Sequence, residues 1–151
     1  MNRNSNWNFA WGPATITALA LLASGMMAAP TVYAADVATS PPASFKKLSS
    51  LVRFPDWAPG LGTLYIEPST LPVGPFLGYN HQGKLVNITY MVPLKDLDAH
   101  KNFDALGGVA AGMKLDHTDL EYNPGHPGVE EPHYHIVQWF ISPAAVKAEM
   151  Q

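Results

Sequence analysis

Residues 132–141 of this chain read PHYHIVQWFI, a run of β-branched and aromatic side chains that begins with a proline. This composition favours an extended strand. Because side chains alternate between the two faces of a strand, His133 and His135 share one face, about 6.6 Å apart along the axis. Val137 and Trp139 continue that face with apolar groups. The stretch therefore predicts a β-strand that carries two imidazoles on one side.

The rest of the chain shows the same short-strand character. Fourteen prolines and twelve glycines interrupt it, which favours strands joined by turns over long helices. The predicted fold class is mainly β, a small antiparallel β-sandwich or barrel with one or two short helices. We expect the other strands at residues 63–67, 74–79, 84–92 and 113–122, and the helices at residues 93–106 and 143–150.

The strand at 84–92 alternates in the manner of a strand with one buried face. Val86, Ile88, Tyr90 and Val92 are its expected core face, because they are the more apolar of the two alternating sets. The other set, which includes Asn87 and Thr89, is more polar.

The N-terminus has the order of charge, apolar run and small residues that is typical of an export signal. Arg3 precedes the uncharged stretch 13–29, and Val32-Tyr33-Ala34 follows. The apolar run is shorter than the roughly 20 residues that a membrane-spanning helix needs. We therefore expect a signal peptide at 1–34, export to the periplasm or the extracellular space, and no membrane association after cleavage. An uncleaved N-terminal anchor is the alternative.

The remaining chain has about 117 residues, the size of one domain. Residues 35–50 contain a Pro/Ser-rich stretch, TSPPAS at 39–44, and are the expected flexible lead-in. Residues 51–151 are expected to form a single mainly-β domain.

The chain has no cysteine. A small exported domain without disulfides must hold itself by burial, by oligomerisation or by a metal. The same absence excludes a thiolate nucleophile, Cys-ligated zinc and type-1 copper. Nine basic residues stand against twelve acidic ones, and without a basic patch this balance argues against a nucleic-acid partner. The partner that we expect is another copy of the chain, in a homo-oligomer.

Four of the six histidines gather with several acids in the last third of the chain. If the strand at 113–122 pairs with the strand at 133–141, their polar faces lie side by side and the loop between them reaches the same end. A carboxylate can add a ligand or orient an imidazole. The sequence therefore predicts a site for a divalent transition metal (zinc, copper or iron), with ligands drawn from His117, His126, His133, His135 and Glu131.

Three functions fit this pattern. The preferred one is an exported module that binds a metal without catalysis, for storage, delivery or structural stabilisation. A mononuclear-metal enzyme would need an open coordination position and a free acid such as Glu131 or Glu121. A metal-free assembly protein of the cell envelope would use exposed aromatic edges for subunit contacts. A pH sensor also fits closely spaced histidines, and the sequence leaves open whether the protein is an enzyme.

Three short motifs resemble the C-terminal signature of a family of uncharacterised exported bacterial proteins. They are Asp116-His117, NPGHP at 123–127 and PHYH at 132–135. The family is a domain of unknown function typified by a sigma-E-regulated protein of an extreme thermophile. Its members carry an Asp-His, an Asn-Pro with a nearby Gly-His, and a Pro-His-aromatic-Asp strand that ends in a further histidine. The resemblance covers residues 60–145 and implies export and a shared fold.

The resemblance also implies that His117, His126 and His133 occupy the positions of family histidines. Two departures affect the site. The loop before His133 is shorter here, and His135 stands where the family pattern has aspartate. Val137 or Gln138 occupies the place of the last family histidine, so the resemblance implies an altered ligand set on this strand.

Overall fold

The computed structural model of the protein describes residues 37–104, 106 and 112–151. The predicted signal peptide at 1–34 lies outside these residues. Among the residues that are described, no helix is both long and apolar enough to cross a membrane.

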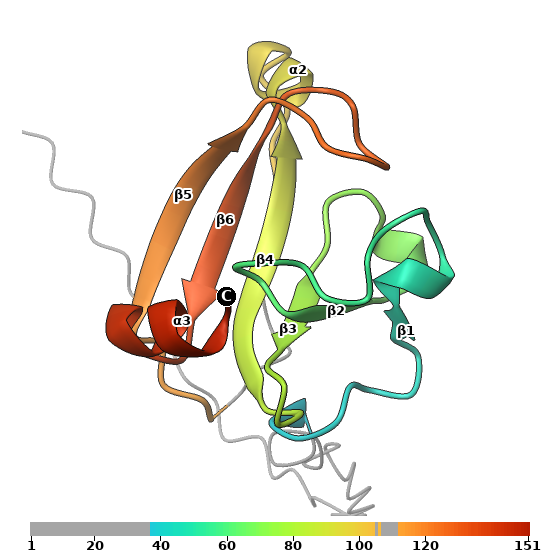
Figure 1. Cartoon of the computed structure of the whole chain (residues 1–151). Helices are drawn as coiled ribbons and strands as arrows, with labels where there is room; N and C mark the ends of the chain where they lie inside the picture. Colours follow the sequence, from blue (N-terminus) through green and yellow to red (C-terminus); the bar gives the residue numbers. More distant parts are fainter. Residues whose placement is uncertain (1–36, 105, 107–111) are drawn as a thin grey trace, which may run out of the picture. The chain divides into compact units, whose positions relative to one another are not determined.

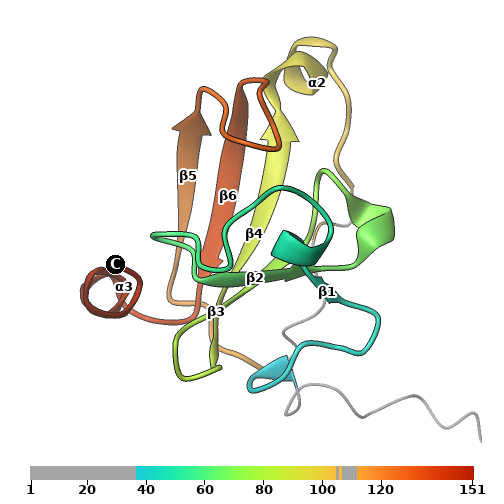
Figure 2. The same ribbon diagram turned by 45° about the vertical axis from the view of Figure 1, so that its right-hand side comes forward.

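In the part of the chain that the structure describes, six strands form one antiparallel sheet in the order β1-β2-β3-β4-β6-β5. Together with the two short α-helices found among the same residues, this mainly-β architecture confirms the predicted fold class. Strands β4, β6 and β5 lie side by side in both views (Figures 1 and 2), and in Figure 2 β2 runs across in front of β4. The elements are β1 (Lys46–Lys47), η1 (Leu48–Ser50), β2 (Thr63–Ile66), η2 (Pro68–Thr70), β3 (Phe76–Tyr79), β4 (Leu85–Pro93), α2 (Leu94–Asp98), β5 (His117–Asn123), β6 (His133–Trp139) and α3 (Pro143–Glu149).

The helix predicted at 93–106 is wrong in length, since α2 ends at Asp98. The cause is a Schellman motif, in which the His100 N–H bonds to the Leu97 carbonyl and the Lys101 N–H bonds to the Asp96 carbonyl, each at 2.9 Å. His100 takes the left-handed position with φ 54°, where glycine is more usual. Gly107 and Gly108, which follow the end of the predicted helix in the sequence, lie outside the described residues.

The C-terminal helix α3 forms where the sequence predicted it. Pro143 opens the helix, and the Ser142 hydroxyl accepts a hydrogen bond from the Ala145 N–H. An N-cap serine followed by a first-turn proline is a favourable helix start, which accounts for a helix at this point of the sequence.

The described part of the expected lead-in at 35–50 packs onto the sheet. Val37 is buried, and its carbonyl accepts a 2.8 Å hydrogen bond from the Tyr79 hydroxyl. The next carbonyl, of Ala38, accepts from the Leu85 N–H at 2.9 Å. The compact structure thus begins earlier in the chain than the Pro/Ser-rich composition indicated, because one buried valine and two hydrogen bonds fasten the segment.

The prediction that β4 has one core face is incomplete, because all nine of its residues are buried. Of the expected face, Ile88 and Tyr90 pack in one apolar cluster with Leu77 and Tyr79. Val86 does not join them, and it packs with Val137 and Trp139 of β6. The opposite face packs in a second cluster, in which Met91 joins residues of β2, β3 and the segment after η1. This second face carries the histidines described below.

Strand β5 is at the edge of the sheet and exposes large apolar groups on its outer side. Leu120 and Tyr122 are 68% and 55% exposed. Unpaired edge strands with apolar side chains are suited to pairing with another chain. The homo-oligomer expected from the sequence stays a prediction.

Candidate metal centre

The strand register places the two β6 histidines on the face that β4 shares with β5. His133 lies opposite Asn123 of β5, and His135 lies opposite Glu121. On the other side, Met91 of β4 pairs with His135. Since residues paired across an antiparallel sheet project to the same face, the predicted side-by-side arrangement of the two polar faces is confirmed.

The loop between β5 and β6 folds back over this face and brings a third histidine to it. The Asn123 carboxamide oxygen accepts from the Gly125 N–H at 2.9 Å, and Gly125 has φ 125°. His126 and Val129 then exchange two backbone hydrogen bonds of 2.8 and 2.9 Å. This tight turn holds the His126 ring edge-on against Phe54, with 5.9 Å between ring centroids.

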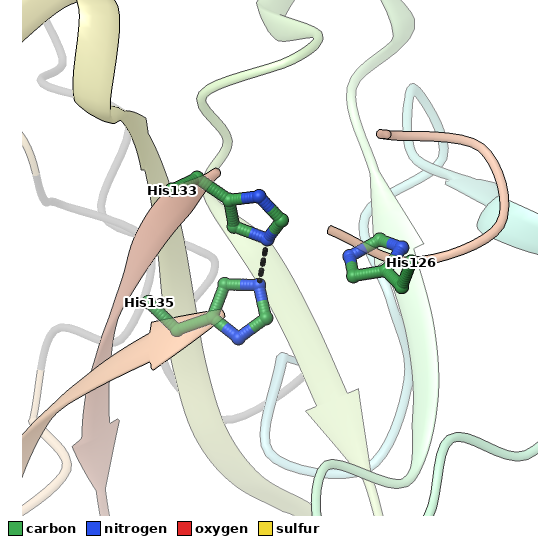
Figure 3. Close-up of side chains that lie close together, drawn as sticks. All are labelled: His126, His133 and His135. Atoms are coloured by element: carbon green, nitrogen blue, oxygen red, sulfur yellow. Dashed lines mark hydrogen bonds between the residues drawn. The ribbon is translucent and has the colours of Figure 1, made fainter. Parts of the chain in front are cut away.

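The imidazoles of His126, His133 and His135 come together in a triad (Figure 3). One ligand nitrogen from each lies within 4.8 Å of the others. The Nε2 atoms of His133 and His135 are 3.0 Å apart. Two nitrogens bound to one tetrahedral zinc at 2.0–2.1 Å would be about 3.3 Å apart. The pair is therefore close to the spacing of ligands on a common ion.

Backbone carbonyls set the tautomers of two of these rings. His133 Nδ1 lies 2.8 Å from the Glu131 carbonyl oxygen, and His126 Nδ1 lies 3.2 Å from that of Pro127. Because a carbonyl only accepts, each Nδ1 carries the proton and each Nε2 keeps its lone pair. Metal-ligating histidines almost always donate their other ring N–H in this way.

His135 is held in its neutral form. Burial, followed by the neighbouring imidazoles of His133 and His126, lowers its pKa to about 4. Neutral imidazole is the form that binds a metal, so the site has a ligand-competent His135 at neutral pH. In the metal-free protein the neutral ring donates its Nε2–H to His133.

This pKa predicts acid sensitivity of the metal-free protein. An unfolded histidine takes up a proton near pH 6.5, whereas folded His135 resists protonation down to about pH 4. Its contribution is therefore fully present above pH 6.5 and is lost as the pH falls to 4, by on the order of 2 kcal/mol. Urea unfolding at pH 7 and pH 4.5 measures the loss. His135→Gln should show a smaller loss, and an equal loss would contradict the assignment.

His117 lies apart from the triad. The register sets it opposite Trp139, four residues along β5 from the partner of His135, or about 13 Å. Its Nδ1 is 2.9 Å from the Asp116 carboxylate, and its ring stacks on Trp139 at 6.1 Å between centroids. The four histidines thus do not converge on one point, and three of them do.

The Glu131 carboxylate also lies outside the triad, since it pairs with Lys95 at 2.6 Å. Glu131 still contributes to the site through its backbone carbonyl, which fixes the His133 ring. Of the five ligands predicted from the sequence, the imidazoles of His126, His133 and His135 come together. Glu131 contributes only its backbone carbonyl, which orients the His133 ring.

A cavity of about 570 Å³ adjoins the triad, and His126 and His135 form part of its wall. No sequence pattern predicted this cavity. Much of its wall comes from residues 48–61, a proline-rich stretch without strand or helix periodicity. The apolar side chains of this stretch were the one feature of the sequence that could have indicated a cavity wall, because such side chains require a surface to pack against. The apolar lining includes Leu48, Val52, Phe54, Ala58, Leu61, Leu64, Phe76, Met91 and Val129.

Comparison with known proteins identifies a similar solved structure. No protein-family model matches the chain, and no curated protein matches it. Among solved structures, the hypothetical protein TTHB210 from Thermus thermophilus is 43% identical over 64% of this chain and 92% of that chain, with a TM-score of 0.59. The chain belongs to the same family as this Thermus protein. The Thermus relative is described as hypothetical, in agreement with the resemblance to an uncharacterised family; export and sigma-E regulation stay predictions.

Proposed function

We propose that this protein is exported and binds a divalent transition metal through His126, His133 and His135. The observation that carries the proposal is the convergence of three ligand nitrogens within 4.8 Å. Two of the rings donate their Nδ1–H to backbone carbonyls, which leaves Nε2 for an ion. A set of neutral imidazoles suits zinc, copper or iron.

Three protein ligands leave a further coordination position for water or another molecule, as in catalytic zinc sites. Because His126 and His135 line the cavity, a position on that side is reachable from it. A mononuclear-metal enzyme needs such an open and reachable position, which a site lying flat on the surface would not offer in a pocket. This observation therefore favours a mononuclear-metal enzyme as a second candidate function. Glu121, the exposed partner of His135 across β5 and β6, is the acid nearest in register.

A metal-free structural role is the third candidate. The 3.0 Å contact between the Nε2 atoms of His133 and His135 satisfies both rings without an ion when one donates and the other accepts. In that case the triad would only fasten the β5–β6 loop to the sheet, and added metal would leave stability unchanged.

The full chain, expressed in a Gram-negative host and recovered from the periplasm, tests the proposal. We expect mass spectrometry to give the mass of a chain that begins at Ala35. We expect the metal content to be about one ion per chain. After chelation, zinc at a hundred times its Kd should stabilise the protein by about 2.7 kcal/mol, or about 10 °C in Tm. If zinc, copper and nickel all leave the Tm unchanged, the proposal that the protein binds a metal is wrong.

A further inference from the structure

We propose that the cavity beside the triad binds a carboxylate with a medium-length apolar tail, and that the carboxylate completes the coordination of the metal. The inference rests on the metal site proposed above. It names the class of molecule that the site takes.

The cavity wall accounts for the tail. The lining side chains are mostly aliphatic, aromatic or proline, and among the described residues that line the cavity none is charged. A volume of about 570 Å³ falls within the range of small-molecule pockets. At roughly 30 Å³ for each water-sized atom it has room for fewer than twenty non-hydrogen atoms. A single medium-length alkyl chain fits this space, whereas a peptide helix or a nucleotide does not.

The polar side chains of the wall are those of Thr89, Asn123, His126 and His135. Thr89 donates its hydroxyl to the Asn87 carboxamide oxygen at 3.1 Å. Asn123 uses its Oδ1 to accept from the Gly125 N–H. These bonds occupy the threonine donor and the asparagine acceptor. The imidazoles of His126 and His135, with the Asn123 amide N–H groups, are left for a ligand.

Charge then selects the head group. Three neutral imidazoles around a divalent ion give the site two positive charges, with no carboxylate among the ligands. Burying uncompensated charge next to an apolar wall is costly, and an anionic head offsets part of it. Carboxylate oxygen is an accepted zinc ligand at about 2.0–2.2 Å, and an Asn123 N–H suits its second oxygen. A neutral molecule such as an alcohol would lack this compensation.

Cobalt(II), a spectroscopic substitute for zinc, separates the metal site from the ligand. The purified protein is first loaded with cobalt and its visible absorption recorded. Decanoate is then titrated into the loaded and the metal-free protein. We expect decanoate to change the cobalt absorption and to bind at least about tenfold more weakly without metal. Decanol should bind the loaded protein about tenfold more weakly than decanoate does. Acetate should bind it about a hundredfold or more weakly than decanoate, since acetate lacks the tail.

A pair of tryptophan variants tests the place of the tail. Val52→Trp fills the cavity from a half-buried lining position, and Leu51→Trp places the same ring on its exposed neighbour, which does not line the cavity. Val52→Trp should weaken decanoate about tenfold or more with cobalt binding unchanged, and Leu51→Trp should bind both like the parent.

The outcomes separate the two proposals. Failure of cobalt to bind would overturn the metal site and this inference together. Cobalt binding with no response of its absorption to decanoate would overturn the carboxylate proposal alone. Equal decanoate affinity in the loaded and the metal-free protein would also overturn the carboxylate proposal alone. So would equal decanoate affinity in Val52→Trp and Leu51→Trp.

Discussion

Replacing His126 or His135 by alanine is expected to lower the zinc affinity of this protein by about a hundredfold or more, while His117→Ala leaves it unchanged. All three histidines lie in the region that the sequence marks as a metal site. Only His126 and His135 present a nitrogen within 4.8 Å of the His133 ligand atom. His117 instead hydrogen-bonds Asp116 and stacks on Trp139.

Competition against a chromophoric chelator gives the zinc affinity of each variant, and circular dichroism checks that each is folded. His117→Ala is the matched control, because it removes the same side chain from the neighbouring strand. An equal loss of affinity in His117→Ala and His135→Ala would show that the ion lies elsewhere on the β5–β6 face.

Gly125→Ala is expected to displace His126 without altering any ligand. A Cβ at this position would lie 2.5 Å from the Glu130 carbonyl oxygen. The residue also has φ 125°, which side chains rarely tolerate. The turn must therefore open, at a cost of about 1–3 kcal/mol. Because it holds the His126 ring over β6, we expect zinc affinity to fall about tenfold or more.

Gly83→Ala is the control for Gly125→Ala. Gly83 also has a positive φ, of 72°, but a Cβ there meets nothing within 4 Å, and it lies in the β3–β4 hairpin. It should cost some stability through backbone strain alone and leave zinc binding intact. If both variants bind zinc like the parent, the conformation of the β5–β6 turn does not position a ligand.

Local periodicity was sufficient to predict part of the site. Alternation along β6 set His133 and His135 on one face, and the polar alternation of β5 predicted which faces would lie together. A period of two is a property of the strand itself and does not depend on distant residues. His126 was also nominated, because a loop between paired strands must remain near their ends.

The alternation of side chains could not predict the register between β5 and β6. The register sets His117 opposite Trp139 rather than His135. A shift by two or four residues changes which side chains meet without changing which face they occupy, so alternation alone cannot distinguish these registers. The course of the β5–β6 loop sets this register, and it depends on the Asn123 side chain and the Gly125 backbone.

The cavity was missed for a different reason. Its wall joins residues 48–61 to β2, β3, β4 and the β5–β6 loop, so it exists only through contacts between distant segments. The same contacts bury the second face of β4, including Asn87 and Thr89. Their polarity had favoured a solvent-facing assignment for that side of the strand.

The most direct measurement is anomalous diffraction at the zinc absorption edge from crystals of the zinc-loaded protein. The proposed site predicts one strong peak at about 2.0–2.1 Å from a nitrogen of each of His126, His133 and His135. A peak beside His117 and the neighbouring carboxylates instead, or crystals of zinc-treated protein with no peak at the triad, would contradict it.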